Sequence, residues 1–138
     1  MDRDRFLIKW VDLLGTLSIF IAECSDGTYF SGIDRNIYKY IDALNRGKRH
    51  NTYLNRFPWK RPISMVFKEE GLPLAEALIK YKTITNMQPF RKRKLIRTGK
   101  WPAIGLWGKY LKNKDSTIDE VLGNSVKEIL DIQNNVDN

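Results

Sequence analysis

Three groups of basic residues, each accompanied by aromatic side chains, are the part of this sequence with the clearest chemical potential. Lysine and arginine bind phosphate groups and aromatic rings stack on bases, so the combination is typical of nucleic-acid contacts. An ordinary solvated helix face and loop would have a similar composition, and this alternative stays open. The residues expected to contact nucleic acid are Arg46, Lys48, Arg49, Lys60, Arg61, Arg91, Lys92, Arg93 and Lys94, with Tyr53, Phe57, Trp59, Phe90 and Trp101 among or beside them.

Other kinds of chemistry have few residues to draw on. His50 is the only histidine and Cys24 the only cysteine, which leaves little for a histidine metal site or a cysteine–histidine nucleophile. The segment between Gly105 and Gly108 lacks the lysine of a phosphate-binding loop. We therefore expect no cofactor and no metal ion. A lone cysteine forms no internal disulfide, which favours an intracellular, cytoplasmic protein.

The charge is divided unevenly along the chain. Of 138 residues with a net charge of +8, residues 1–114 hold 23 Lys and Arg against 10 Asp and Glu, whereas residues 115–138 hold one lysine against six acids. A basic body suggests a polyanionic partner, with nucleic acid as the first candidate. The apolar runs are too short to span a membrane, so we expect no membrane partner.

Apolar periodicity predicts the elements that must position these residues. Strands are expected over residues 17–24 and 28–33, joined at Asp26-Gly27, a strong hairpin signal, and a third strand over 62–68. Helices are expected over 3–14, 35–44, 74–87, from Pro89 and over 106–111, with a last one capped by Ser116 or Thr117. Residues 45–61 show no period. The order predicts an α+β fold, a small antiparallel three-stranded sheet flanked by helices, with extra N- and C-terminal helices.

Several landmarks between residues 17 and 96 resemble those of GIY-YIG nuclease domains. Each is weak alone, but they occur in the family's order and spacing. They are Phe20-Ile21, Phe30-Ser31-Gly32, Asn45-Arg46-Gly47-Lys48, Arg61-Pro62 before Val66-Phe67, Glu76-Ala77-Leu78 and Lys94-Leu95-Ile96. The resemblance implies a GIY-YIG-like domain over residues 16–98, preceded by an N-terminal helix over 1–15 and followed by a helical extension over 99–138.

The positions that would carry catalysis in such a nuclease hold other residues. Phe20 replaces the tyrosine of the first motif, and Phe30, two residues before Gly32, replaces that of the second. Tyr40 stands where the family has its arginine, and Tyr81 where it has its metal-binding glutamate. Phenylalanine has no hydroxyl with which to move a proton, and tyrosine supplies neither a guanidinium fork nor a carboxylate.

The resemblance therefore implies the scaffold of an endonuclease without its chemistry. Our first hypothesis is a catalytically inactive protein that binds DNA or RNA, with the four substituted positions filling the former catalytic cleft or exposing a stacking platform. The alternative is an interaction or structural subunit that docks on proteins, through its basic body and its acidic C-terminal helix. The third is a metal-dependent endonuclease with relocated residues, for which Glu69 and Glu70 are the nearest carboxylates.

Overall fold

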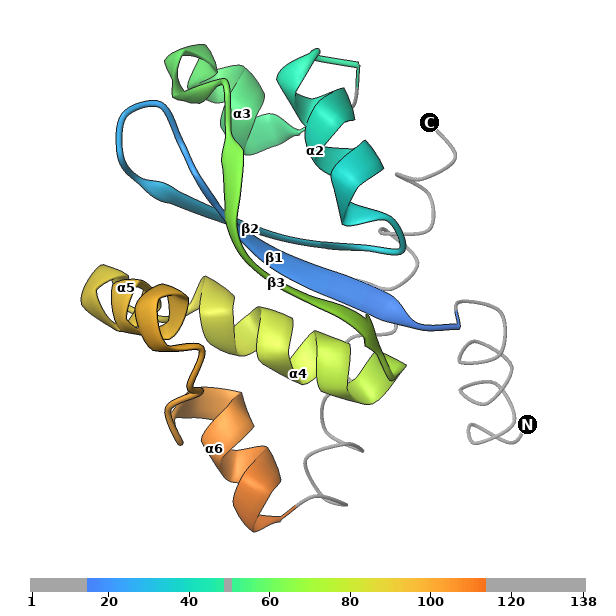
Figure 1. Ribbon diagram of the computed structural model, residues 1–138, viewed down its shortest axis with the longest axis vertical. Coiled ribbons are helices and arrows are strands. Elements are labelled where there is room, and N and C mark those ends of the chain that lie inside the picture. Colours follow the sequence, from blue (N-terminus) through green and yellow to red (C-terminus); the bar gives the residue numbers. More distant parts are fainter. Residues whose placement is uncertain (1–14, 49–50, 114–138) are drawn as a thin grey trace.

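A three-stranded antiparallel sheet with helices on both faces forms the body of the protein (Figure 1). The structure, a computed structural model, describes residues 15–48 and 51–113. The elements are β1 (Leu17–Glu23), β2 (Tyr29–Asp34), α2 (Ile37–Asn45), α3 (Thr52–Arg56), the 3-10 turn η1 (Pro58–Lys60), β3 (Ser64–Leu72), α4 (Leu74–Thr85), α5 (Pro89–Thr98) and α6 (Gly105–Lys112). The predicted fold class is confirmed. The helices expected over 3–14 and after Ser116 lie outside the described residues.

The sheet has the order β2-β1-β3, so β1 is central and pairs on both sides. The turn between β1 and β2 forms where Asp26-Gly27 predicted it, because Gly27 adopts a φ of 83° that favours glycine. The Asp26 carboxylate accepts a hydrogen bond from the backbone N–H of Thr28 at 3.1 Å, which closes the turn. Phe20 pairs with Gly32 across the two strands.

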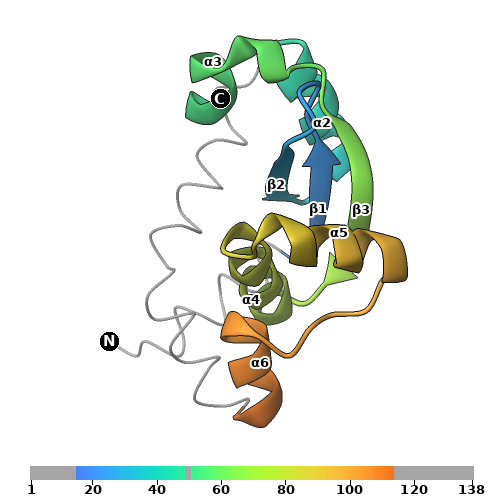
Figure 2. The same cartoon turned by 90° about the vertical axis from the view of Figure 1, so that its left-hand side faces the viewer.

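Alternate residues of β1 enter two separate apolar clusters. Ile19 and Ile21 pack with Leu78 of α4, whereas Phe20 and Ala22 pack on the other face with residues of α2. Figures 1 and 2 show α2 and α3 on one side of the sheet and α4, α5 and α6 on the other. Because both faces of β1 are covered, its sequence is apolar throughout instead of alternating.

The helices begin and end close to the predicted residues. α2 starts at Ile37, two residues later than predicted, because Asn36 is its N-cap and accepts from the N–H of Lys39 at 3.1 Å. α5 starts at Pro89 as predicted and ends at Gly99, which has a φ of 70°. α6 lies in the predicted C-terminal extension and packs against α4. In the part of the chain that the structure describes, no helix is long and apolar enough to cross a membrane.

Two segments differ from the sequence-based prediction. β3 was expected to end at Lys68 but continues to Leu72, because Glu69 and Leu72 pair with β1. The connection over 45–61, for which no period was found, contains α3 and η1. α3 is only five residues long, and its N-cap Asn51 accepts from the N–H of Leu54 at 2.9 Å. A helix this short shows no apolar period in the sequence, and it is its N-cap that sets where it begins.

Candidate nucleic-acid interface

Three of the four positions that match the nuclease motif gather on the α2 face of the sheet. Phe20 is fully buried, and its ring centroid lies 6.2 Å from that of Phe30 and 5.9 Å from that of Tyr40. A Cβ atom on Gly32 would lie 2.4 Å from Cε1 and from Cζ of Phe20. The Phe20 ring therefore occupies the space over the glycine, and only glycine leaves room for it.

Tyr81 lies elsewhere. It belongs to α4 and packs against the apolar cluster that contains Ile19 and Leu78, on the opposite face of the sheet. The structure thus brings Phe20, Phe30 and Tyr40 together and places Tyr81 in the other cluster.

These positions do not fit the divalent cation that the nuclease family implies. Phe20 and Phe30 offer no oxygen, and Tyr81 offers a phenol in place of the carboxylate that hard cations prefer. Among the described residues, no group of three or more His, Cys, Asp and Glu side chains is placed to hold a metal ion.

Glu69, one of the two carboxylates considered for a relocated active site, is engaged in an ion pair. Glu69 of β3 accepts from Nζ of Lys80 at 2.6 Å and from the indole N–H of Trp101. Lys80 is buried and also pairs with Glu76 at 3.1 Å. Its Nζ lies 5.1 Å and 4.7 Å from the ring centroids of Trp101 and Trp107. This cluster joins β3, α4, α6 and the segment before α6, which fixes Trp101 beside α5.

A groove with basic walls and an aromatic floor lies beside Trp101. Its volume is about 400 Å³, and we name it the α5 groove; it is lined by Arg91, Lys94, Leu95, Thr98, Lys100, Trp101 and Pro102. Arg91, Lys94, Leu95 and Thr98 share one face of α5 because residues three, four and seven apart lie on the same side of a helix. Gly99 then turns the chain, and Lys100 to Pro102 form the opposite wall. Three cations around an apolar floor suit a phosphate and its attached nucleoside.

The other predicted cations of α5 lie outside the α5 groove. Arg93 lies about 200° around the helix from Arg91, and is exposed. Lys92 is half-buried, and burial lowers the pKa of its ammonium group. The helical twist therefore points the four consecutive basic side chains in different directions. Of these four, only Arg91 and Lys94 line the groove.

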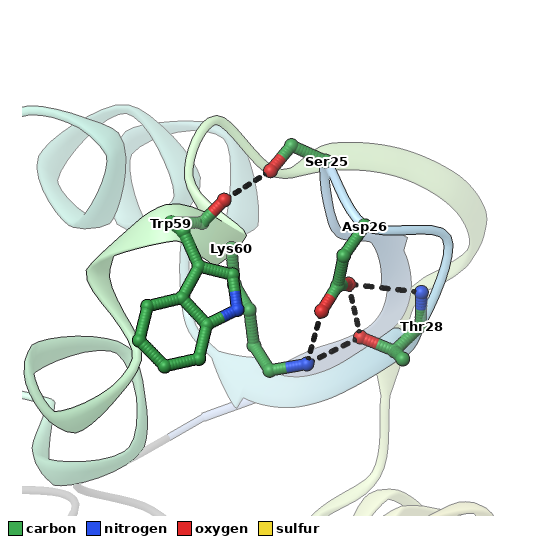
Figure 3. A network of polar contacts seen from close by, with 5 residues as sticks. All are labelled: Ser25, Asp26, Thr28, Trp59 and Lys60. Carbon is green, nitrogen blue, oxygen red and sulfur yellow. Dashed lines mark hydrogen bonds and ion pairs between the residues drawn. The ribbon is translucent and has the colours of Figure 1, made fainter.

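The structure gives the predicted cations Lys60 and Arg61 internal partners. Lys60 is only 8% exposed, and its Nζ donates to Asp26 at 2.6 Å and to the hydroxyl of Thr28 at 2.8 Å (Figure 3). The hydrogen bond from Lys60 lowers the pKa of Asp26 to about 2. Arg61 donates to the backbone carbonyls of Leu44 and Leu54 at 2.7 and 3.3 Å. Both cations hold the scaffold together, so we remove them from the candidate interface.

The remaining predicted cations precede α3. Arg46 is exposed and pairs with Asp42 at 3.2 Å, a solvent-screened contact that leaves the guanidinium accessible. Lys48 is also exposed. Arg49 lies outside the described residues. The structure does not place Arg46 and Lys48 in the α5 groove.

In the α5 groove, Trp101, which the sequence already placed beside the basic residues, is joined by Lys100, which is not among the nine predicted contacts. Lys100 and Trp101 follow Gly99, the glycine at which α5 ends, and this glycine signals a turn in the chain. The sequence does not show in which direction the chain leaves that turn. The tertiary contacts of Trp101 with Phe67, Lys80 and Trp107 decide that direction.

The fold and the motif-matching positions together define a small α+β domain of the GIY-YIG-like kind. The chain belongs to the UPF0213 family, which is related to GIY-YIG nucleases: it is 30% identical over 79 residues to a UPF0213 protein of Desulfotalea psychrophila, covering 57% of this chain and 69% of that relative. Two UPF0213 proteins of Streptococcus agalactiae are each 36% identical over 67 residues, covering 47% of this chain and 75% of theirs. No family model and no solved structure matches the chain.

Proposed function

We propose that the protein binds nucleic acid through the α5 groove and does not cut it. The observation that supports this most is the groove itself, which Arg91, Lys94 and Lys100 line together with Trp101. Cations hold phosphates without regard to sequence, and an aromatic floor accepts a sugar or a base. The proposed binding is therefore sequence-tolerant and sensitive to salt.

The proposed lack of cleavage rests on the residues at the motif-matching positions. Hydrolysis of a phosphodiester needs an activated water and a cation or arginine that stabilises charge at phosphorus. Phe20 and Phe30 can neither take nor give a proton, and Tyr40 lacks the permanent positive charge of an arginine guanidinium group. Of the two carboxylates considered for a relocated site, Glu69 pairs with the buried Lys80 at 2.6 Å and Glu70 pairs with Lys68 at 3.5 Å.

A pair of matched double variants tests the proposed binding. Arg91→Gln with Lys94→Gln removes two charges from the α5 groove, and Arg93→Gln with Arg97→Gln removes two charges from elsewhere on α5. We expect the groove variant to bind a labelled oligonucleotide about tenfold or more weakly than the control variant, because each charged hydrogen bond contributes about 1.5–3 kcal/mol. Fluorescence anisotropy at a fixed salt concentration measures the affinity of both double variants for the oligonucleotide.

Equal losses in the two variants would mean that net charge alone, not the groove, attracts the nucleic acid. If neither variant nor the parent binds nucleic acid, the proposal is wrong. The basic body would then be interpreted as a protein-docking surface, the alternative that the sequence left open.

A further inference from the structure

A continuous row of aromatic rings connects the filled motif positions to the surface. Consecutive ring centroids lie 5.4–6.2 Å apart, and the aromatic row consists of Phe20, Phe30, Tyr53, Phe57 and Trp59. Its inner end, Phe20, is fully buried, whereas its outer end, Trp59, is 61% exposed. A single exposed apolar side chain is ordinary, but Trp59 is joined through Phe57 to Tyr53, which is also exposed, and a contiguous exposed aromatic patch of this kind marks a candidate contact surface.

The backbone beneath Trp59 is held by the turn between β1 and β2 (Figure 3). The N–H of Ser25 donates to the carbonyl of Lys60 at 2.9 Å, and the hydroxyl of Ser25 donates to the carbonyl of Trp59. The ion pair between Lys60 and Asp26 at 2.6 Å closes the same network. Trp59 therefore projects from a fixed support, and a ligand that contacts it need not order the backbone first.

Two cations, one buried and one exposed, contact rings of the aromatic row. Nζ of Lys60 lies 5.6 Å from the ring centroid of Tyr53 and 5.9 Å from that of Phe57. The guanidinium carbon of Arg56 lies 5.5 Å from the centroid of the Phe57 ring. Lys60 is paired with Asp26, whereas Arg56 is exposed and can meet a ligand. An exposed ring near an accessible arginine matches a ligand that combines a flat aromatic group with negative charge, which is the chemistry of a nucleotide.

The faces that a base offers for stacking narrow the class of nucleic acid. Figures 1 and 2 show α3 and α5 at the same end of the sheet, the end that carries the turn between β1 and β2, with one on either side of that turn. Because α3 and α5 lie on opposite faces of the sheet, a strand that reaches both the α5 groove and η1 must pass around this end of the sheet. Bases within a duplex are stacked on one another and present no free face, whereas an unpaired base does.

We propose that Trp59 stacks on an unpaired base of a strand whose phosphates lie in the α5 groove, so that the protein prefers single-stranded regions to duplex. This inference rests on the proposed function and names its substrate class. The phosphate contacts supply affinity for any strand, and the stack adds affinity only where a base is unpaired.

The test compares a labelled oligothymidine with a duplex of equal length. Trp59→Ala should weaken binding of the oligothymidine by about 5- to 150-fold, the range for loss of one base stack. Binding of the duplex should change less than about twofold, because the phosphate contacts are unaltered. Trp59→Phe, which keeps a ring, should retain most of the affinity. Leu111→Ala is the control, because it removes from α6 an apolar side chain that is exposed, like Trp59. It should change neither the binding of the oligothymidine nor that of the duplex.

Photocrosslinking is a second measurement that needs no variant. An oligonucleotide with 5-bromouracil, irradiated on the full chain, should link to the peptide that contains Trp59. Equal losses on both ligands with Trp59→Ala, or no loss on oligothymidine together with no crosslink at Trp59, would overturn the inference. If the groove variant of Arg91 and Lys94 then still weakens binding, the proposed function stands and only the stacking role is wrong. If the parent protein binds no nucleic acid, both are wrong.

Discussion

The packing of Phe20 against Gly32 gives a prediction about the filled motif positions whose size follows from the structure. A Cβ atom on residue 32 would lie 2.4 Å from Cε1 and Cζ of Phe20 and 3.1 Å from Cε1 of Tyr40. Carbon atoms prefer a separation of about 3.5–4.0 Å, so the ring would have to move by about 1 Å. The ring is fully buried and touches Phe30 and Tyr40, so it has no space into which to move.

Gly32→Ala should therefore lower the free energy of unfolding by about 2–3 kcal/mol, the upper part of the range for overpacking. In a strand without such a clash, alanine would instead be favoured over glycine by about 0.5–1 kcal/mol. Phe20→Leu removes Cε1 and Cζ, and should cost about 1–2 kcal/mol alone, below the ~3–5 kcal/mol of Phe→Ala. In the Phe20→Leu background, Gly32→Ala should cost almost nothing, which corresponds to a coupling energy of about 2 kcal/mol.

Guanidinium denaturation followed by circular dichroism measures all four members of this cycle. Gly108→Ala is the matched control, because its Cβ would lie 2.7 Å from the backbone carbon and oxygen of Ala103. Phe20→Leu should not relieve that clash. If Gly32→Ala costs the same with and without the Phe20 ring, the ring does not fill the space over the glycine and the argument is refuted.

Three further predictions concern the buried cations and the chemistry. Lys80→Ala should destabilise the fold by about 3 kcal/mol, the low end for a broken buried pair because Glu69 and Glu76 are partly exposed, whereas Lys48→Ala should cost less than about 0.5 kcal/mol in the same denaturation assay. Asp26 has a pKa lowered from 3.8 to about 2, so its contribution to stability is present above about pH 4 and is lost as the pH falls toward 2; Asp26→Asn should remove that part of the acid dependence, measured as the difference between the two unfolding curves across this window. The purified protein with Mg²⁺ or Mn²⁺ should cut neither single-stranded, duplex nor branched DNA above a buffer control, and robust cleavage would revive the hypothesis of a relocated active site.

Short-range signals in the sequence predict the fold well. The turn at Asp26-Gly27 and the start of α5 at Pro89 are set by neighbouring residues, and both occur where expected. The end of β3 was missed because Lys68, Glu69 and Glu70 look like a solvated loop. Glu69 belongs to the strand because Lys80 and Trp101, 11 and 32 residues away, neutralise and bind its carboxylate. No local pattern contains that information.

In the candidate site, too, some residues can be predicted from the local sequence and others depend on the fold. Helical spacing places Arg91 and Lys94 on one face of α5, and this much follows from the sequence. Lys60 was predicted as a phosphate contact because it lies in a basic segment, but its partner Asp26 is 34 residues away. Lys100 lines the α5 groove because the chain after Gly99 turns back beside α5, and that direction likewise depends on tertiary packing. Charge clusters in the sequence therefore identify candidate cations, and only the fold separates those that face solvent from those that hold the scaffold.

The salt dependence of nucleic-acid binding tests the central claim most directly. For the full chain and a duplex, the logarithm of the binding constant should fall linearly with the logarithm of salt concentration, with a slope of about −0.9 for each phosphate contact. Arg91→Gln with Lys94→Gln should make that slope less steep by about two units, whereas Arg93→Gln with Arg97→Gln should change it by less than one. Binding that does not depend on salt, or equal slopes in the parent and the groove variant, would contradict a phosphate-binding α5 groove.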